Sequence, residues 1–115
     1  MPLSAAVRGD GVLYASGQVP VDPQTRQVVE GGIEAQTRQT LENLKLTLAL
    51  AGASLTDVVK VNIFLTGMTT FTAMNGVYRE YFANVPPART TVGTTGLANP
   101  AMQIEIEAIA LAPES

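Results

Sequence analysis

The sequence predicts an α+β domain in which two helices cover one face of a β-sheet. Apolar residues recur at steps of three and four in two separate stretches, and they alternate with polar residues in several shorter ones. These stretches follow the order strands, helix, strand, helix, two strands. At 115 residues the chain fits one domain, residues 1–115. Because two helices cover only one sheet face, the other face is expected to need a partner.

The first part of the chain is predicted to form two short strands, residues 3–7 and 12–16. A tight Gly-Asp-Gly turn at residues 9–11 joins them, since these residue types tolerate the positive φ angles of such turns. Gly17 is expected to end the second strand. A loop with two prolines follows, and residues 27–29 are a candidate third short strand.

Residues 33–51 are predicted to form the first helix, because their apolar residues share one face. That face consists of Ile33, Thr37, Leu41, Leu44, Leu48 and Ala51. Polar residues, Gln36 among them, are expected to fall largely off it. Gly52 is a natural C-terminal stop, and residues 54–57 are predicted to form a turn.

The next strand is predicted at residues 58–65, where the side chains alternate. Its aliphatic face consists of Val59, Val61, Ile63 and Leu65. Lys60 lies on the mixed face and is expected to extend to solvent rather than act in catalysis. Two further strands are predicted at residues 89–95 and 102–111, separated by a loop with a proline.

A second helix is predicted to start at a Thr69 or Thr70 cap and to end at the prolines at residues 86–87. Its helically spaced residues are Phe71, Met74, Tyr78, Tyr81 and Phe82, and the aromatic cluster is expected to be helix core rather than a ligand cage. Gly76 inside this helix costs about 1 kcal/mol relative to Ala. A packing reason for this glycine is therefore expected.

Composition excludes several function classes. Only 15% of residues are charged, below the roughly 25% that is typical, which suggests that another subunit covers part of the surface. The net charge of −3 and seven scattered cations offer no basic stripe for nucleic acid. Without cysteine or histidine, the chain has no thiolate, disulfide or zinc-thiolate site and lacks the usual general base.

The amino terminus has no apolar segment of signal-peptide length and reaches charged residues by Arg8 and Asp10. No window approaches the roughly 20 apolar residues that a membrane helix needs. A cytoplasmic protein without membrane association is therefore expected.

The stretch at residues 86–110 carries the strongest chemistry of the chain. It places Arg89 at the start of one predicted strand and Glu105 and Glu107 inside another. A guanidinium can give two parallel hydrogen bonds to one carboxylate. A site for a small-molecule acid is one interpretation, and a surface arginine at a strand start is the other.

Four segments together resemble the RidA (YjgF) family: PLSAAVRGDGVLYASGQVPVDP, DVVKVNIFL, FTAMNGVYREYF and PPARTTVGTTGLANPAMQIEIEAIAL. The resemblance implies a chorismate-mutase-like α+β fold with a mixed β-sheet. It also implies a homotrimer with a barrel-like core and three ligand sites in the clefts between subunits. The implied activity is hydrolysis of reactive 2-enamine and 2-imino acids, such as 2-aminoacrylate, to 2-keto acids and ammonia without a metal or organic cofactor.

The resemblance also implies roles for individual residues. Arg89 aligns with the arginine that pairs with the substrate carboxylate. Glu105 aligns with the glutamate that positions or deprotonates the attacking water, a role suited to a carboxylate whose pKa is lifted by partial burial. Glu107, two residues on, should share its face and is interpreted as a structural ion-pair partner.

Ser16 and Asn75 align with polar residues near the family's ligand, although either could instead close a local backbone hydrogen bond. Gly17 and the backbone amides around Thr91 are further candidate donors to the ligand. The sequence pattern around Gly17 would be the same for any glycine in a β-turn.

Two departures from the family pattern leave alternatives open. Leu3 stands where many members carry a tyrosine that closes over the ligand, and Tyr14 in the next strand is not its equivalent. Thr91 stands where some members carry cysteine, so a hydrogen bond remains possible but a redox thiol does not. The alternatives are a trimeric binder or sensor of small carboxylates that does not turn them over and, more weakly supported, a holdase-like chaperone.

Overall fold

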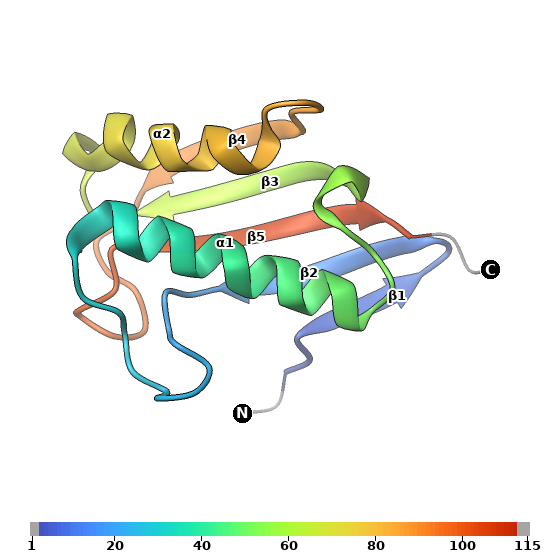
Figure 1. The fold of residues 1–115 in the computed structure, drawn as a ribbon, viewed down its shortest axis with the longest axis horizontal. Coiled ribbons are helices and arrows are strands. Elements are labelled where there is room, and N and C mark those ends of the chain that lie inside the picture. The colour runs from blue at the N-terminus through green and yellow to red at the C-terminus, as the bar shows by residue number, and fades with distance from the viewer. Residues whose placement is uncertain (1–2, 113–115) are drawn as a thin grey trace.

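A computed structural model describes residues 3–112 and shows one five-stranded sheet with two helices on one of its faces (Figure 1). The elements are β1 (Ala6–Gly9), β2 (Val12–Gln18), α1 (Gly32–Leu50), β3 (Val58–Leu65), α2 (Phe71–Phe82), β4 (Ala88–Gly93) and β5 (Ile104–Leu111). The strand order is β1-β2-β5-β3-β4, and only β3 and β4 pair in parallel. The predicted α+β layer is confirmed; residues 1–2 and 113–115 of the predicted domain lie outside the described residues.

The first hairpin turns more tightly than the sequence pattern suggests. β1 begins three residues later than predicted and continues to Gly9, which pairs with Val12. The turn consists of Asp10 and Gly11 alone, with φ angles of 52° and 75°. Two successive positive φ angles match the twist of the flanking strands, so the strands can run up to the turn itself.

The prediction that Gly17 ends the second strand is wrong. β2 continues to Gln18, but its pairing with β5 shifts between Ala15, which pairs with Ala108, and Gln18. An extra residue in one strand is a β-bulge, which bends the strand instead of ending it. Glycine tolerates this local distortion because it has no side chain to pack.

The predicted strand at residues 27–29 is also wrong. The loop holds one isolated bridge, between Val21 and Val28. It turns at Asp22, whose carbonyl accepts a hydrogen bond from the backbone N–H of Arg26 at 2.7 Å. Arg26 has a φ of 63°, which interrupts extended pairing.

Helix α1 confirms the predicted face and end, with one exception. The residues Thr37, Leu41, Leu44 and Leu48 are buried, and Gly52 follows the helix with a φ of 83°. Gln36, expected largely off the face, is only 5% exposed. Its amide donates to Ala101 O at 2.9 Å and accepts from the backbone N–H of Gln103 at 2.7 Å. These bonds explain how a polar side chain can be buried there.

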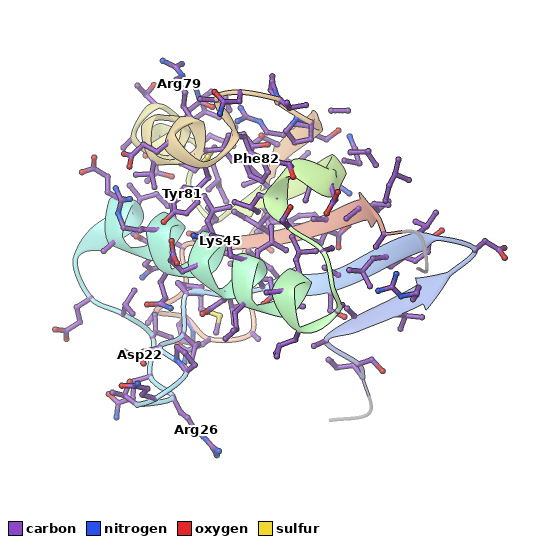
Figure 2. All side chains as sticks on the ribbon, turned by 45° about the vertical axis from the view of Figure 1, so that its right-hand side comes forward. Asp22, Arg26, Lys45, Arg79, Tyr81 and Phe82 are labelled. Atoms are coloured by element: carbon purple, nitrogen blue, oxygen red, sulfur yellow. The ribbon has the colours of Figure 1, made fainter. Side chains whose placement is uncertain are left out.

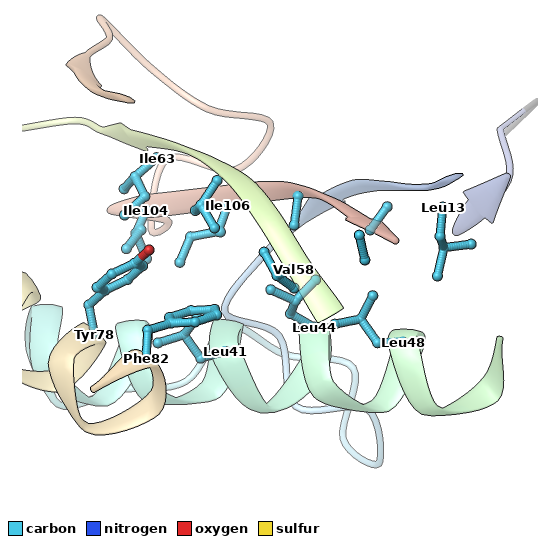
Figure 3. Packing of buried hydrophobic residues seen from close by; sticks show 14 of the residues in the cluster. Leu13, Leu41, Leu44, Leu48, Val58, Ile63, Tyr78, Phe82, Ile104 and Ile106 are labelled. Carbon is cyan, nitrogen blue, oxygen red and sulfur yellow. The ribbon is translucent and has the colours of Figure 1, made fainter. Parts of the chain in front are cut away.

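The core lies between the sheet and α1, where leucines of the helix meet aliphatic residues of β5 and β3 (Figure 3). One prediction for β3 is wrong: Val58 is buried, whereas Val59 is 41% exposed. The pairing of β3 with β5 shifts between Val58 and Lys60. This irregularity reverses the alternation at the start of the strand, while Val61 and the later residues keep the predicted face.

Helix α2 starts without the predicted threonine cap. A short 3₁₀ helix, Met68–Thr70, precedes it, and the Thr70 hydroxyl donates to Gly67 O at 2.7 Å instead of capping α2. The helix ends four residues before Pro86. No atom lies within 4 Å of the place where a Cβ at Gly76 would stand, so the described chain holds no packing reason for this glycine.

The two helices are joined at the surface by polar contacts. Arg38 and Glu80 form two hydrogen bonds of 3.0 and 3.2 Å, and the Tyr81 hydroxyl donates to Glu42 at 2.7 Å. Tyr81 also faces Lys45 of α1 (Figure 2), whose Nζ lies 6.0 Å from its ring centroid. Exposed pairs of this kind contribute little to stability, because water and salt screen the charges. Within residues 3–112, neither helix combines the length and apolarity needed to cross a membrane.

Candidate functional site

Arg89 lies on β4 and points toward α2, on the helix-covered face of the sheet. Its register partner on β3 is Val61, which is fully buried. Arg89 Nη1 donates to Asn75 Oδ1 at 2.6 Å, and Cζ lies 4.7 Å from the ring centroid of Tyr78 and 5.5 Å from that of Phe71. We call these four residues, Arg89, Asn75, Tyr78 and Phe71, the arginine cradle. Its aromatic rings attract the guanidinium and limit its freedom, unlike the surroundings of an ordinary surface arginine.

The guanidinium of Arg89 has no carboxylate partner in the described part of the chain. The ion pairs found there join Arg38 to Glu80 and Lys45 to Glu42. A guanidinium has five N–H donors, and the bond to Asn75 uses one of them. The cradle therefore presents a fixed, uncompensated positive charge, which is the electrostatic requirement for holding an anion.

Two hydroxyl groups beside Arg89 are buried without a hydrogen-bond partner among the described residues, those of Tyr78 and Thr91. Tyr78 is 6% exposed, and its hydroxyl points toward the sheet in Figure 3. Burial raises the pKa of Tyr78, and the charge of Arg89 partly offsets this. A buried unpaired hydroxyl costs free energy unless a water or ligand atom satisfies it.

Tyr78 is the residue that sequence reasoning missed. It does belong to the helix core, as expected, but it also contacts Arg89. The sequence does contain a signal for this position of Tyr78. Asn75 and Tyr78 are three residues apart on one helix and therefore share a face.

Glu105 lies on the opposite, uncovered face of the sheet. Its register partner on β3 is Phe64, three residues from Val61 and therefore on the other side of the strand. A Cβ at Gly17 would overlap Glu105 Oε2 and stand 3.1 Å from Cγ, so the carboxyl group occupies the space above this glycine. The bulge in β2 brings the Gly17 backbone to this position.

The pKa of Glu105 is raised, first by burial and second by the negative charge of Glu107. A raised pKa is the condition that the water-activating role requires. A carboxylate whose charged form is disfavoured is a better proton acceptor than an ordinary solvent-exposed one.

Glu107 and Ser16 make local contacts. Glu107 Oε2 accepts a hydrogen bond from Asn62 Nδ2 at 2.9 Å, so among the described residues its partner is an amide and not the predicted cation. The Ser16 hydroxyl donates to Ser4 O at 2.6 Å, which is the local backbone bond that sequence reasoning left open. Lys60, on the same face, donates to the Thr90 hydroxyl at 2.7 Å.

The predicted site residues thus form two groups on opposite sides of the sheet. Arg89, Asn75 and Thr91 lie on the helix-covered side, and Glu105, Gly17 and Ser16 belong to the uncovered side. A small ligand cannot contact both groups within one chain. Leu3, at the position of the missing tyrosine, is 63% exposed and lies outside the cradle.

The charged side chains do not suggest a metal centre. Within residues 3–112, no three acidic side chains gather closely enough to hold an ion. The groups available for chemistry are the guanidinium, the carboxyl groups, the hydroxyls and the backbone.

Comparison with known proteins gives consistent matches along the chain. Residues 1–112 match the family described as Endoribonuclease L-PSP. A RutC family protein of Pyrococcus horikoshii is 48% identical over 109 residues, covering 95% of this chain and 86% of the relative. The 2-iminobutanoate/2-iminopropanoate deaminase of Dermatophagoides farinae is 40% identical over 108 residues, covering 94% and 84%. A solved Rid family protein of unknown function from Yersinia pestis superposes with a TM-score of 0.93 at 41% identity, covering 96% and 88%.

Proposed function

The chain belongs to the RidA (YjgF) family, described as Endoribonuclease L-PSP, and we propose that it hydrolyses reactive 2-imino and 2-enamine acids to 2-keto acids and ammonia. The observation that carries this proposal is the arginine cradle, whose uncompensated guanidinium suits the carboxylate that all such substrates share. The deaminase of Dermatophagoides farinae, 40% identical to this chain, supports the same chemistry.

The proposed reaction needs no cofactor, because the imine carbon is already electrophilic. Water adds to this carbon, a C–O bond forms, and the π electrons of the C=N bond move to nitrogen. Glu105 accepts a proton from the water and delivers it to nitrogen, which gives a tetrahedral carbinolamine. Glu105 then accepts the proton of the new hydroxyl group and returns it to the amino nitrogen, so that ammonia leaves with the C–N bonding electrons as the C=O bond of the 2-keto acid forms. A 2-enamine acid enters this sequence after tautomerising to the imine, by gaining a proton at C3 and losing one from nitrogen. General-base assistance of this kind contributes roughly 10²- to 10⁴-fold in rate.

The substrate site is proposed to lie between two copies of the chain. Since Arg89 and Glu105 lie on opposite sides of one sheet, a cleft that contains both requires the cradle of one subunit and Glu105 of the next. A homotrimer closes such a head-to-tail arrangement. The uncovered sheet face supports association, because Val7, Tyr14 and Leu111 are 57%, 51% and 51% exposed there.

The proposed ligand is a small 2-imino or 2-keto acid, and the proposed compartment is the cytoplasm. Nucleic acid is not proposed as a partner, although the family's description names a ribonuclease. The net charge is −3, and the Arg38 cation is paired with Glu80. Affinity for RNA depends on clustered cations that neutralise phosphates.

A binder or sensor of small carboxylates is the second candidate. Leu3 motivates it, because a leucine cannot supply the hydroxyl contact of the tyrosine that many family members carry. Calorimetry with 2-ketobutyrate, paired with an assay, separates the two. Binding that depends on Arg89 without any acceleration of hydrolysis would favour the sensor.

The function is tested with a pyridoxal-dependent dehydratase that releases a 2-imino acid, whose lifetime is followed with and without this protein. The enzyme hypothesis expects a shorter lifetime with the native chain and, at substrate concentrations below KM, a much smaller effect with Arg89→Met or Glu105→Gln.

The shared site is tested by refolding these two impaired variants together in equal amounts and assaying them at substrate concentrations below KM. If each site takes its arginine and glutamate from different subunits, random trimers recover about a quarter of the native activity. Each variant refolded alone is the control. Recovery no greater than these controls would contradict the shared site.

A further inference from the structure

The uncovered face of the sheet holds a hollow of about 240 Å³ that neither Arg89 nor Glu105 lines. Four polar side chains border it, Tyr14 from β2, Lys60 and Asn62 from β3, and Glu107 from β5, and Ile109 of β5 contributes apolar surface. The hollow is smaller than the roughly 300–1,000 Å³ of pockets for drug-sized ligands. Its size therefore suits a molecule of only a few heavy atoms.

The hollow contains one positive and one negative side chain that do not neutralise each other. The ion pairs within 4.0 Å in the described part of the chain do not include Lys60 or Glu107. Lys60 Nζ is instead bound to the Thr90 hydroxyl at 2.7 Å, and Glu107 Oε2 to Asn62 at 2.9 Å. These neutral partners hold the two charges at separate places around one cavity.

Both charged groups retain free hydrogen-bonding capacity. An ammonium has three donors, and Lys60 uses one of them on Thr90. A carboxylate has two oxygens, and the bond from Asn62 engages only Oε2 of Glu107. A ligand with one positive and one negative end could use the free hydrogen-bonding capacity of both groups.

We propose that this hollow is a second binding site, for a small zwitterion such as a short amino acid. The ligand's ammonium binds Glu107 beside the hydroxyl of Tyr14, its carboxylate binds Lys60, and its short carbon chain lies against Ile109. A singly charged molecule fits less well, because it would desolvate the opposite charge of the site without compensating it. This site is separate from the proposed substrate site and does not depend on it.

Association of subunits through the uncovered face would enclose the hollow. Excluding bulk water lowers the effective dielectric constant and strengthens each charge interaction. Binding would then be stronger in the assembled protein than in an isolated chain.

The test uses the native protein and zwitterions of increasing length, namely glycine, β-alanine and 4-aminobutanoate, with propionate and propylamine as singly charged controls. Binding is measured by calorimetry and located by the NMR shifts of the Ile109 methyl groups. We expect one zwitterion length to bind best. Lys60→Met and Glu107→Gln should each weaken it at least about tenfold, since hydrogen bonds to charged groups contribute about 1.5–3 kcal/mol.

Matched variants distinguish binding in the hollow from binding elsewhere on the protein. Lys45→Met removes an exposed lysine of α1 and should leave binding unchanged, as should Arg89→Met. Lys60→Arg keeps the charge and should retain most of the affinity, which distinguishes loss of a ligand contact from a folding defect. The proposal is overturned if propionate binds as well as the zwitterions, if Arg89→Met abolishes binding, or if no probe shifts the Ile109 methyl groups.

Discussion

Arg89 and Glu105 project from opposite faces of one sheet, with strand β3 between their two strands. In a 2-imino acid, the carboxylate and the reacting carbon are directly bonded. The group that anchors the carboxylate and the group that delivers water to the reacting carbon must therefore lie within a few ångströms of each other. Neither movement of a side chain nor a change of rotamer can bring these two through the sheet. Under the proposed function, the single chain therefore carries two half-sites.

Replacing Arg89 by methionine should weaken substrate binding while the fold is retained. The loss of charge-assisted hydrogen bonds predicts a rise in KM of roughly 10- to 100-fold. Arg89→Lys should retain only part of the native affinity for substrate, because an ammonium lacks the planar fork of a guanidinium. Steady-state kinetics of imine hydrolysis measure both effects.

Arg79→Met is the matched control for Arg89. Arg79 is exposed on α2 and points away from the molecule (Figure 2). Its replacement should leave KM unchanged. An equal effect of both arginine variants would show that general charge, and not the cradle, attracts the substrate.

Replacing Glu105 by glutamine should lower kcat by roughly 10²- to 10⁴-fold, because the amide cannot accept the proton from water. Binding of a 2-keto acid should persist, since the Arg89 cradle is intact. Single-turnover kinetics and calorimetry separate the two effects. Unchanged kcat would assign proton transfer to another group.

Activity should rise with pH as Glu105 loses its proton, with a midpoint above the ordinary glutamate range because burial and Glu107 raise its pKa. Glu107→Gln removes the negative charge but not the burial. The pKa of Glu105 should then fall, and the acidic limb of kcat/KM should move to lower pH. An acidic limb that stays in place would mean that Glu107 does not influence the base.

Gly17→Ala should impair activity more than stability. The new Cβ would overlap the Glu105 carboxyl oxygen, which is the far end of a flexible side chain and can move aside. A displacement of about 1 Å in a catalytic group can cost roughly 10²-fold in rate. Gly96→Ala is the control, because no atom lies within 4 Å of the place where its new methyl group would stand. Thermal unfolding and kcat should be measured together, and equal losses of both would contradict this reasoning.

Gly76→Ala should stabilise the protein by about 1 kcal/mol, because alanine is the better helix former and the site has open space. Chemical denaturation at fixed protein concentration measures the free energy of unfolding of the native chain and the variant. A destabilised variant would indicate that another copy of the chain packs against this glycine, since nothing in the described chain does.

Most of the fold could be predicted because it rests on strong periodic patterns. The boundaries of α1 differ from the expected residues 33–51 by one residue at each end. The errors occur where an irregularity breaks a pattern. Val58 takes the buried place expected for Val59, and Gly17 continues a strand through a bulge. A bulge depends on how two strands pair, which a pattern along one strand does not contain.

The site was harder to predict for a related reason. Alternation shows which residues of one strand share a face, but it does not relate the faces of two strands that lie far apart in the sequence. Arg89 and Glu105 therefore looked like members of one cluster. The role of Tyr78 was hidden because a buried aromatic residue of a helix satisfies the core pattern equally well.

The hydrogen bonds of Gln36 have a consequence for the order of folding. This side chain holds the segment just before β5 through a contact that spans 67 residues. Contacts across such distances form slowly, because a long loop must close first. During refolding, helical signal should return before Glu105 takes its place on the sheet, so catalytic competence would be among the last properties that the chain acquires.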